Sequence, residues 1–431
     1  MQNLSKPWHQ LSFVGLMLAS LAVALTTSPA RAEPVELSLW IFLDPDGTDP
    51  RGHALKRVVD SFNAKHSDVN VKVNSVHWTK IDSLAIQATA AGKGPDLLNI
   101  YTNQLAMHVG AETIRPLTSY AEPWLKRMDT EYAFPIAATT FGDQIMAVPW
   151  ELRVFLLWYR KDALEEAGLA LPATLDEVAV MGGKLRKAFG EQSVGFAVGL
   201  SEKQYGAQFA ETFFPILWAN GGRVFDDQGK AAFHGDAGVE AMRWFRDAVH
   251  KHKVIGREGV TMGIDEITSG VRAGTVFMTV GGSMRVAAAR TGVGGNLATA
   301  PLPGLTADKP APGLIAGQTM AIGKNTKHPD KAWMFIEHFL SKESQLEFAS
   351  ASVMPVLASA YDDPTIASTS QGPELKMWME YVRDHGMMER LPEDYTQLAE
   401  KMAKAAQQIV YNDAPIRETL AKVAKDYNAG H

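Results

Sequence analysis

Aromatic side chains stand at the ends of several predicted strands. Trp40 ends a short apolar segment, Tyr101 follows another, and Trp150 follows Val148-Pro149. A pyranose ring presents an apolar C–H face that packs on an indole, while its hydroxyl rim needs amide, carboxylate or guanidinium partners. In an open α/β sheet the ligand crevice lies beyond the carboxyl ends of the strands. These positions therefore predict a sugar-binding site, with core packing as the competing interpretation of each tryptophan.

Catalytic motifs are missing from the sequence. The string nearest to a G-x-S-x-G nucleophile elbow, Gly281-Gly282-Ser283-Met284-Arg285, fails at its last glycine. Neither a Walker loop nor an H-E-x-x-H zinc motif occurs. Acidic pairs such as Asp226-Asp227 lie in turn-like sequence and do not form a placed acid/base pair. We predict a protein without catalytic residues, and a secreted carbohydrate-active enzyme is the alternative.

The residue types that hold metals and cofactors are also poorly placed. The chain has no cysteine, which removes thiolate metal sites and iron–sulfur clusters. His250 and His252 stand at i and i+2, so they would point to different faces of a helix. The aspartates around Gly47 do not follow the order of a calcium-binding EF-hand loop. The sequence therefore predicts no metal and no cofactor.

Length and charge restrict the class of protein. At 431 residues, 46% of them hydrophobic, the chain is long enough for two to three domains with cores of their own. Lysine and arginine number 42 against 48 aspartate and glutamate residues, a net charge of −6. A chain with this balance has no strongly basic surface, which argues against nucleic acid as a partner.

The first 32 residues have the layout of a secretory signal peptide. Lys6 precedes an apolar run from Leu11 to Leu25, and small residues at Ala30 and Ala32 suit a signal peptidase. A membrane-spanning helix needs about 20 apolar residues, which this run does not reach. We therefore expect cleavage after about Ala32 and a periplasmic protein without stable membrane insertion. A lipoprotein is excluded because it would need a cysteine at the cleavage point.

Hydrophobic periodicity after the signal predicts an α/β fold. Alternating or continuous apolar strand segments at 35–42, 69–73 and 97–100 are separated by segments of helical spacing, which indicates two βαβ crossovers and a parallel sheet. Similar alternation at 145–159 and 194–199 predicts a second α/β unit that begins near residue 145. The C-terminal part is helical, with apolar stripes near 332–339, 398–409 and 416–427.

Six strings, in order along the chain, resemble a known family. They are Gly94-Pro95-Asp96-Leu97-Leu98, Val148-Pro149-Trp150 with Tyr159-Arg160-Lys161-Asp162, Thr174-Leu175-Asp176-Glu177, Trp218-Ala219-Asn220-Gly221-Gly222, Ala273-Gly274 with Val280-Gly281-Gly282-Ser283, and Pro301-Leu302-Pro303-Gly304. On these strings the chain resembles the extracellular solute-binding proteins of ABC importers, family 1, the maltose-binding-like group. It departs from the family pattern at Arg160, where asparagine is usual, and at Met284, where an aromatic stacking residue is common.

The resemblance implies the type II periplasmic-binding-protein (Venus flytrap) fold, in which crossing segments join two α/β lobes. Lobe 1 would hold residues 33–144 plus 302–350, and lobe 2 residues 145–301 plus 351–431, with helices at the C-terminus. A small-molecule sugar or sugar derivative in the cleft would favour the closed state, which the membrane permease subunits of an ABC importer would recognise. The family also implies a monomer. Its iron-binding relatives use adjacent tyrosines, and this chain has no Tyr-Tyr pair.

The predicted ligand-binding residues come from strand ends and loops of both halves of the chain. They are Trp40, Asp44, Tyr101, Trp150, Glu151, Arg153, Trp218, Asn220, Gly281, Gly282, Arg285 and Gln318. Gly281 and Gly282 would bring backbone N–H groups close to a ligand, or else form a tight turn. The Gln318 amide can donate to a hydroxyl or accept from one, and Asp44 can instead cap a helix.

Two of these residues decide the class of ligand. The planar guanidinium groups of Arg153 and Arg285 match a carboxylate, phosphate or sulfonate better than a hydroxyl. An acidic, phosphorylated or sulfonated sugar is thus the alternative to a neutral saccharide. The competing interpretation is that each arginine pairs with a protein carboxylate, for which Glu151 is the first candidate, because an unpaired charge in a cleft is costly.

Overall fold

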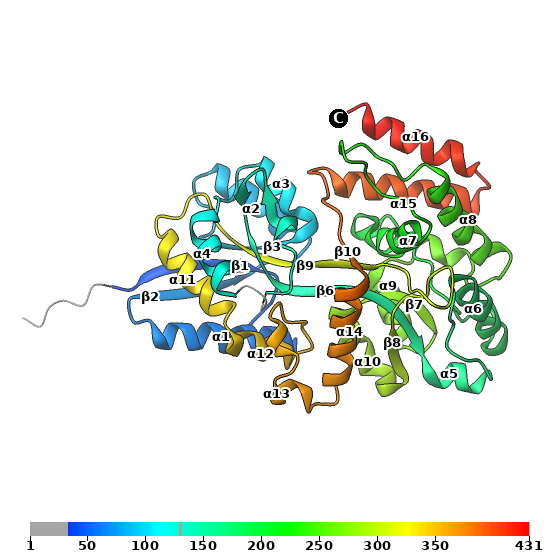
Figure 1. Cartoon of the computed structure of the whole chain (residues 1–431), viewed down its shortest axis with the longest axis horizontal. Helices are drawn as coiled ribbons and strands as arrows, with labels where there is room; N and C mark the ends of the chain where they lie inside the picture. Colours follow the sequence, from blue (N-terminus) through cyan, green and yellow to red (C-terminus); the bar gives the residue numbers. More distant parts are fainter. Residues whose placement is uncertain (1–32, 129–131, 431) are drawn as a thin grey trace, which may run out of the picture.

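The computed structural model describes residues 33–128 and 132–430. The predicted signal peptide, residues 1–32, lies outside the described residues, so its cleavage stays a prediction. Two groups of helices and strands lie side by side and are joined by long strands (Figure 1). We call the group with the N-terminal strands lobe 1, and the group with the C-terminal helices lobe 2.

The elements keep one numbering throughout. The strands are β1 (Val35–Ile41), β2 (Val69–Ser75), β3 (Leu97–Tyr101), β4 (Thr140–Phe141), β5 (Gln144–Ile145), β6 (Val148–Arg160), β7 (Met278–Gly282), β8 (Leu297–Ala300), β9 (Gly313–Ile322) and β10 (Gly386–Met387). The helices are α1 (Pro50–Lys65), α2 (Ile81–Ala90), α3 (Leu105–Gly110), α4 (Thr118–Met128), α5 (Lys161–Glu166), α6 (Leu175–Phe189), α7 (Ala207–Ala219), α8 (Asp236–His250), α9 (Ile264–Arg272), α10 (Val286–Val293), α11 (Pro329–Phe339), α12 (Lys342–Ala349), α13 (Pro364–Ala367), α14 (Gly372–His385), α15 (Tyr395–Tyr411) and α16 (Ile416–Asn428). Short 3₁₀ helices at the site are η1 (Thr102–Gln104), η4 (Lys203–Gly206) and η6 (Ser283–Arg285).

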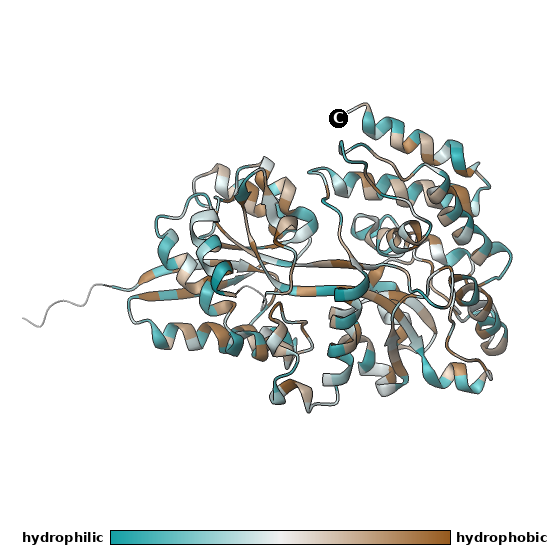
Figure 2. Cartoon of the chain, in the orientation of Figure 1, coloured by the Kyte–Doolittle hydropathy of each residue, from teal (hydrophilic) through white to brown (hydrophobic). Residues whose placement is uncertain are grey.

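Lobe 1 confirms the two predicted βαβ crossovers. β1 pairs with β2 and with β3, both in parallel. Helix α1 begins at Pro50 because the Asp49 side chain caps it by accepting from the Arg51 N–H, and proline is well suited to the first helical turn. Apolar residues at helical spacing bury one face of α1. The hydropathy view shows the same pattern, with hydrophobic strands inside and hydrophilic residues on the outer helix faces (Figure 2).

Strands β6 and β9 run through both lobes. β9 pairs with β3 in lobe 1, whereas β6 pairs with β7 and β8 in lobe 2, and β6 and β9 pair antiparallel with each other from Val148–Met320 to Val154–Ile315. The ladder shifts register between Pro149 and Glu151. Gly317 lies at this crossing, and a Cβ atom there would come within 2.2 Å of the Glu151 carbonyl oxygen. The two strands can therefore approach this closely only with glycine at position 317.

Lobe 2 combines the antiparallel strands β6, β7 and β8 with a helical layer. Helices α7, α8, α15 and α16 pack together on one side of this sheet, in the upper part of lobe 2 in Figure 1. Helix α14 is tied to this lobe because Arg290 donates to both carboxylate oxygens of Glu374, at 2.7 and 2.8 Å. The predicted C-terminal helices are thus confirmed as α15 and α16.

One predicted strand is wrong. Residues 194–199 form no regular strand and pair with the β7 segment through isolated bridges, Val194 with Val276 just before β7 and Ala197 with Thr279 of β7. A Cβ atom at Gly195 would lie 1.7 Å from the Gly182 carbonyl oxygen of α6, so this segment is held by close packing on the helix. The predicted lobe boundaries, 33–144 plus 302–350 and 145–301 plus 351–431, stay predictions.

Candidate ligand-binding site

A cavity of about 360 Å³ lies between the lobes. Its volume falls in the range of about 300–1,000 Å³ that is typical of small-molecule sites. Lobe 1 contributes Phe42, Arg51, Trp78, Asn99, Tyr101 and Gln318. Lobe 2 contributes Gln204, Tyr205, Glu211, Asp265, Arg285 and Tyr395, and the crossing strand β6 contributes Arg153. We call this space the interlobe cavity.

Four of the twelve predicted residues line the interlobe cavity. They are Tyr101, Arg153, Arg285 and Gln318. Tyr101 ends β3, Arg153 and Gln318 lie on the crossing strands, and Arg285 ends η6. The sheet, the crossing and the start of α10 thus bring together side chains that are far apart in the sequence. Whether each of them contacts a ligand stays a prediction.

Asn99 and Gln318 line the base of the cavity and are hydrogen-bonded in a chain with Trp150, which lies outside the lining. The indole Nε1 of Trp150 donates to Asn99 Oδ1 at 2.8 Å, and Asn99 Nδ2 donates to Gln318 Oε1 at 2.8 Å. Because an indole N–H can only donate, Trp150 fixes the orientation of the Asn99 amide, which in turn fixes that of Gln318. The Gln318 NH₂ group is thereby left to donate into the cavity, where a sugar hydroxyl can accept.

Arg153 has its charge satisfied within the protein. Its Nε and Nη2 donate to the two carboxylate oxygens of Glu151 at 2.7 and 2.9 Å, and both residues are buried. Its guanidinium also lies 5.2 Å from the centre of the Tyr101 ring. Burial acts to lower the pKa of Arg153, but the charge and hydrogen bonds of Glu151 raise it more. The two N–H groups of Arg153 that could bind an anion are therefore already used by Glu151.

Arg285 is also paired, but nearer to solvent. Its Nη1 lies 3.1 Å from Asp265 Oδ1, and Gln204 donates to the other oxygen of the same carboxylate at 2.6 Å. On the lobe 1 side, Arg51 makes a similar pair with Asp49, at 2.7 Å. Three of the four arginines that line the cavity thus have carboxylate partners, whereas Arg272 lines it without an ion pair among the described residues. For Arg153 and Arg285 this is the competing interpretation that the sequence left open.

Predicted tryptophans lie outside the cavity lining, in packed surroundings. Trp150 is 1% exposed and packs against Phe339 and Phe348, so it acts on the site only through Asn99. Trp218 lies in the last turn of α7, not in a free turn, and donates to Glu389 at 2.7 Å. Trp40 is half-buried on β1 and packs against a small apolar cluster of lobe 1. These contacts agree with the core-packing interpretation of the three residues.

The other five predicted residues also have structural contacts instead of a place in the lining. Asp44 is exposed and accepts from the Asp46 N–H, while Glu151 is committed to Arg153. Asn220 donates to the Ile216 carbonyl at the end of α7. Gly281 and Gly282 are buried in β7, where a Cβ atom would lie 2.4 Å from the Trp158 indole and from the Met284 sulfur, respectively. Gly281 is thus needed for packing against the rigid indole, whereas the flexible Met284 side chain could move away from a larger residue at position 282.

Sequence reasoning missed several cavity residues, of which Asn99, Glu211 and Tyr395 matter most. Asn99 is the single polar residue of the apolar segment 97–101, and Glu211 is the single charged residue of the segment 209–218; that isolation was the available signal. Glu211 is buried, and burial raises its pKa to about 8 although Arg285 and Arg153 act to lower it. Tyr395 begins α15, and burial also raises its pKa, so its phenol is neutral.

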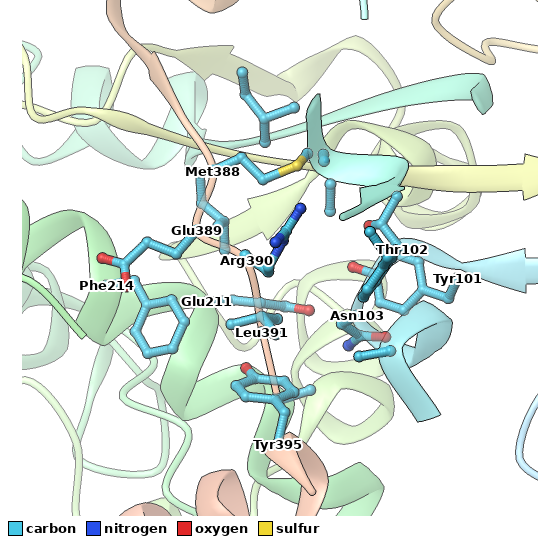
Figure 3. Close-up of a pocket in the computed structure, with 17 residues that line it drawn as sticks. Tyr101, Thr102, Asn103, Glu211, Phe214, Met388, Glu389, Arg390, Leu391 and Tyr395 are labelled. Atoms are coloured by element: carbon cyan, nitrogen blue, oxygen red, sulfur yellow. The ribbon is translucent and has the colours of Figure 1, made fainter. Parts of the chain in front are cut away.

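A smaller pocket of about 60 Å³ adjoins the interlobe cavity and shares Tyr101, Asn103, Glu211 and Tyr395 with it. Figure 3 shows the chain between β10 and α15 running along this pocket. We call residues 388–394 the strap. Glu389 of the strap accepts from the indole of Trp218 and from two backbone N–H groups of lobe 2.

Further features of the described residues bear on other classes of protein. Residues 33–128 and 132–430 hold no group of three or more metal-ligating side chains that could bind an ion. Across the same residues, no helix is both long and apolar enough to cross a bilayer.

The fold and cavity define a two-lobed solute-binding protein. Residues 46–346 match the family model of the bacterial extracellular solute-binding proteins, and the chain belongs to this family. The family and its named relatives are binding proteins, which agrees with the prediction that the chain is not an enzyme.

Curated relatives are distant and match over part of their length. A probable ABC transporter-binding protein of Deinococcus radiodurans is 25% identical over 53% of this chain and 55% of its own length. The sn-glycerol-3-phosphate-binding periplasmic protein UgpB of Yersinia enterocolitica is 28% identical over 42% of each chain. The present chain thus spans about half the length of these relatives or less.

Solved structures confirm the predicted fold class. Maltose-bound MalE3 of T. maritima has a TM-score of 0.77 at 22% identity, with 92% of this chain and 100% of that chain covered. UgpB of Mycobacterium tuberculosis in complex with glycerophosphocholine has the same TM-score at 17% identity, with 93% and 98% covered.

Proposed function

We propose that the protein is the periplasmic receptor of an ABC importer and that it captures a sugar or sugar derivative in the interlobe cavity. The observation that carries this proposal is the lining: aromatic, amide and charged side chains of both lobes converge on one cavity of about 360 Å³. Aromatic faces and the Gln318 amide suit the apolar face and the hydroxyl rim of a pyranose.

The crossing strands β6 and β9 support a mechanism in which the lobes close over the ligand before it is delivered to the permease. A ligand that contacts both lobes stabilises the closed arrangement, in which β6 and β9 bend at the crossing. The membrane permease would then recognise the closed lobes. We propose a monomer in the periplasm, with lobe boundaries near those predicted from the sequence.

The paired arginines support the proposal that the part of the sugar bound at the base of the cavity carries no negative charge. Arg153 donates twice to Glu151, Arg285 is held by Asp265, and Arg51 by Asp49. An anion at this base would have to compete with carboxylates that are already in place. The partial similarity to UgpB proteins makes phosphorylated polyols the necessary comparison.

A thermal-shift panel on the refolded, ligand-free protein tests the proposal. Neutral sugars, amino sugars, uronic acids and sugar phosphates are compared, since a ligand at 100 times its Kd stabilises the folded state by about 2.7 kcal/mol. We expect Tm to rise with non-anionic sugars, and the shift to fall in Gln318→Ala. Asn412→Ala is the control, because Asn412 is exposed at the end of α15 and donates to Gln408 Oε1, outside the cavity lining. A panel in which no carbohydrate raises Tm would overturn the proposed function, and shifts with anions alone would overturn the neutral base.

A further inference from the structure

Glu211 is a single acidic residue in the apolar helix α7, and it faces the ligand space. It is 9% exposed and belongs to the wall shared by the interlobe cavity and the smaller adjoining pocket. In Figure 3 its carboxyl group extends from α7 toward the side where Tyr101 and Asn103 of lobe 1 lie. A carboxyl group thus stands at the junction of the two lobes and the two hollows.

The described part of the protein provides no hydrogen bond donor to this carboxyl group. Arg153 and Arg285 are close enough to act on it electrostatically, but they bond to Glu151 and Asp265. Arg390, which lines the adjoining pocket, donates to the Thr140 carbonyl oxygen instead. A buried carboxylate without a partner is strongly disfavoured, and burial accordingly raises the pKa of Glu211 to about 8.

A second unsatisfied acceptor lies opposite, on lobe 1. Asn103 Oδ1 is buried and has no hydrogen bond partner among the described residues, and Asn103 lines both hollows. When Glu211 is ionised, both lobes present acceptors, which favours a ligand group that only donates. A protonated primary amine has three N–H donors and no acceptor.

The rings around Glu211 suit a cation as well. Tyr101, Phe214 and Tyr395 line the adjoining pocket, and Figure 3 shows their rings around the space that Glu211 and Leu391 enter. Aromatic faces attract cations, and more strongly where water is excluded. Burial raises the pKa of both tyrosines, which keeps their phenols neutral.

We propose that Glu211 and Asn103 form a subsite for a protonated amine, so that the receptor takes an amino sugar or a similar amine-bearing polyol. This inference rests on the proposed sugar-receptor function and specifies its ligand class. Binding of the ammonium group stabilises the ionised carboxylate. A receptor that holds a proton on Glu211 near pH 7 therefore releases it on binding.

The test is isothermal titration calorimetry with matched probes at pH 7. D-glucosamine and 6-amino-6-deoxy-D-glucose are compared with D-glucose and N-acetyl-D-glucosamine, and ethanolamine serves as an amine that is not a sugar. We expect at least one amino sugar to bind about tenfold or more tightly than its neutral counterparts, which corresponds to about 1.4 kcal/mol. Repeating the titration in buffers of different ionisation enthalpy should show release of about one proton.

Variants locate the effect. Glu211→Gln keeps the shape of the side chain and removes its charge, so it should abolish both the preference for the amine and the proton release. Asn103→Ala should weaken amine binding several-fold, and Asn412→Ala, at an exposed position outside both hollows, should change neither affinity nor proton release. A single cooperative thermal transition and a far-UV circular dichroism spectrum like that of the native protein would show that Glu211→Gln retains the fold.

The outcomes separate the two proposals. Neutral sugars that bind as tightly as the amines, or an amine preference that survives in Glu211→Gln, would overturn the amine subsite and leave the sugar receptor in place. Ethanolamine binding without sugar binding would keep the amine subsite and overturn the sugar. Binding of none of the probes would overturn the amino-sugar assignment, and the wider carbohydrate panel would then decide the proposed function separately.

Discussion

Glu389 and Arg390 are neighbours in the sequence and bind opposite lobes. Glu389 accepts from Trp218, Val224 and Phe225 of lobe 2. Arg390 donates to the Thr140 carbonyl oxygen of lobe 1, and its guanidinium lies 5.0 Å from the centre of the Phe141 ring. The strap thus links the lobes beside the cavity, independently of the strands β6 and β9.

Cutting the lobe 1 attachment of the strap should favour the open arrangement. We expect Arg390→Ala to increase the radius of gyration of the ligand-free protein in small-angle X-ray scattering and to weaken sugar binding several-fold. Arg383→Ala is the control, because Arg383 pairs only with its neighbour Asp384. Unchanged scattering and affinity in Arg390→Ala would show that the strap does not hold the lobes.

Removing one indole N–H should disturb the base of the cavity without emptying the core. Trp150→Phe deletes the donor to Asn99, so the Asn99 and Gln318 amides lose their fixed orientation. We expect sugar affinity to fall about three- to tenfold, as for loss of a typical hydrogen bond. Trp158→Phe is the matched control, because the Trp158 indole N–H is buried without a partner in the described structure. Calorimetry in which both variants lose affinity equally would contradict the prediction.

Replacing one partner of the buried Glu151–Arg153 ion pair should destabilise the protein more than replacing both partners. Arg153→Met leaves the Glu151 carboxylate, which is 1% exposed, without its counter-charge. We expect a loss of about 3–5 kcal/mol in the free energy of unfolding, measured by urea denaturation. The double variant Glu151→Gln/Arg153→Met should recover most of this loss, and a double variant as unstable as the single one would refute the explanation.

The stability of the ligand-free protein should depend on pH through Glu211. Its pKa is raised from 4.5 to about 8 in the folded protein, so between these values the folded chain holds a proton that the unfolded chain has lost. Stability contributed in this way is present at low pH and declines as pH rises toward 8. The Tm of Glu211→Gln minus the Tm of the native protein should therefore increase as the pH is raised from 5 to 9. The exposed Glu202→Gln variant should show no such trend, and parallel Tm curves for Glu211→Gln would rule out the effect.

The fold was largely predictable from the sequence, whereas the site was predictable only in part. The periods of the apolar residues are local properties, and they predicted β1 to β3 and the C-terminal helices. Trp150 was expected at a strand end, but β6 continues to Arg160, so this tryptophan lies within the crossing and faces α11 and α12. A local pattern does not reveal where a long strand passes from one lobe to the other.

Long-range pairing explains the other differences. The short spacing of Glu151 and Arg153 let their ion pair be named in advance. Glu211 was not predicted because its lack of a charged partner depends on the pairing of Arg153 and Arg285 with other carboxylates. Tyr395 was not predicted because the C-terminal segment reaches the cavity only after it crosses between the lobes. Such features depend on three-dimensional packing and leave little trace in neighbouring residues.

The crossing strands also restrict what a permease could sense. A strand can twist and bend, but its covalent length is fixed, and each rung between β6 and β9 resists sliding of one strand along the other. At Gly317 the two backbones lie so close that a Cβ atom would come within 2.2 Å of the Glu151 carbonyl oxygen. We therefore expect the lobes to rotate about the crossing without separating or shearing there. A permease would then detect an occupied cavity through the angle between the two lobes. Ligands of different shape could produce the same angle.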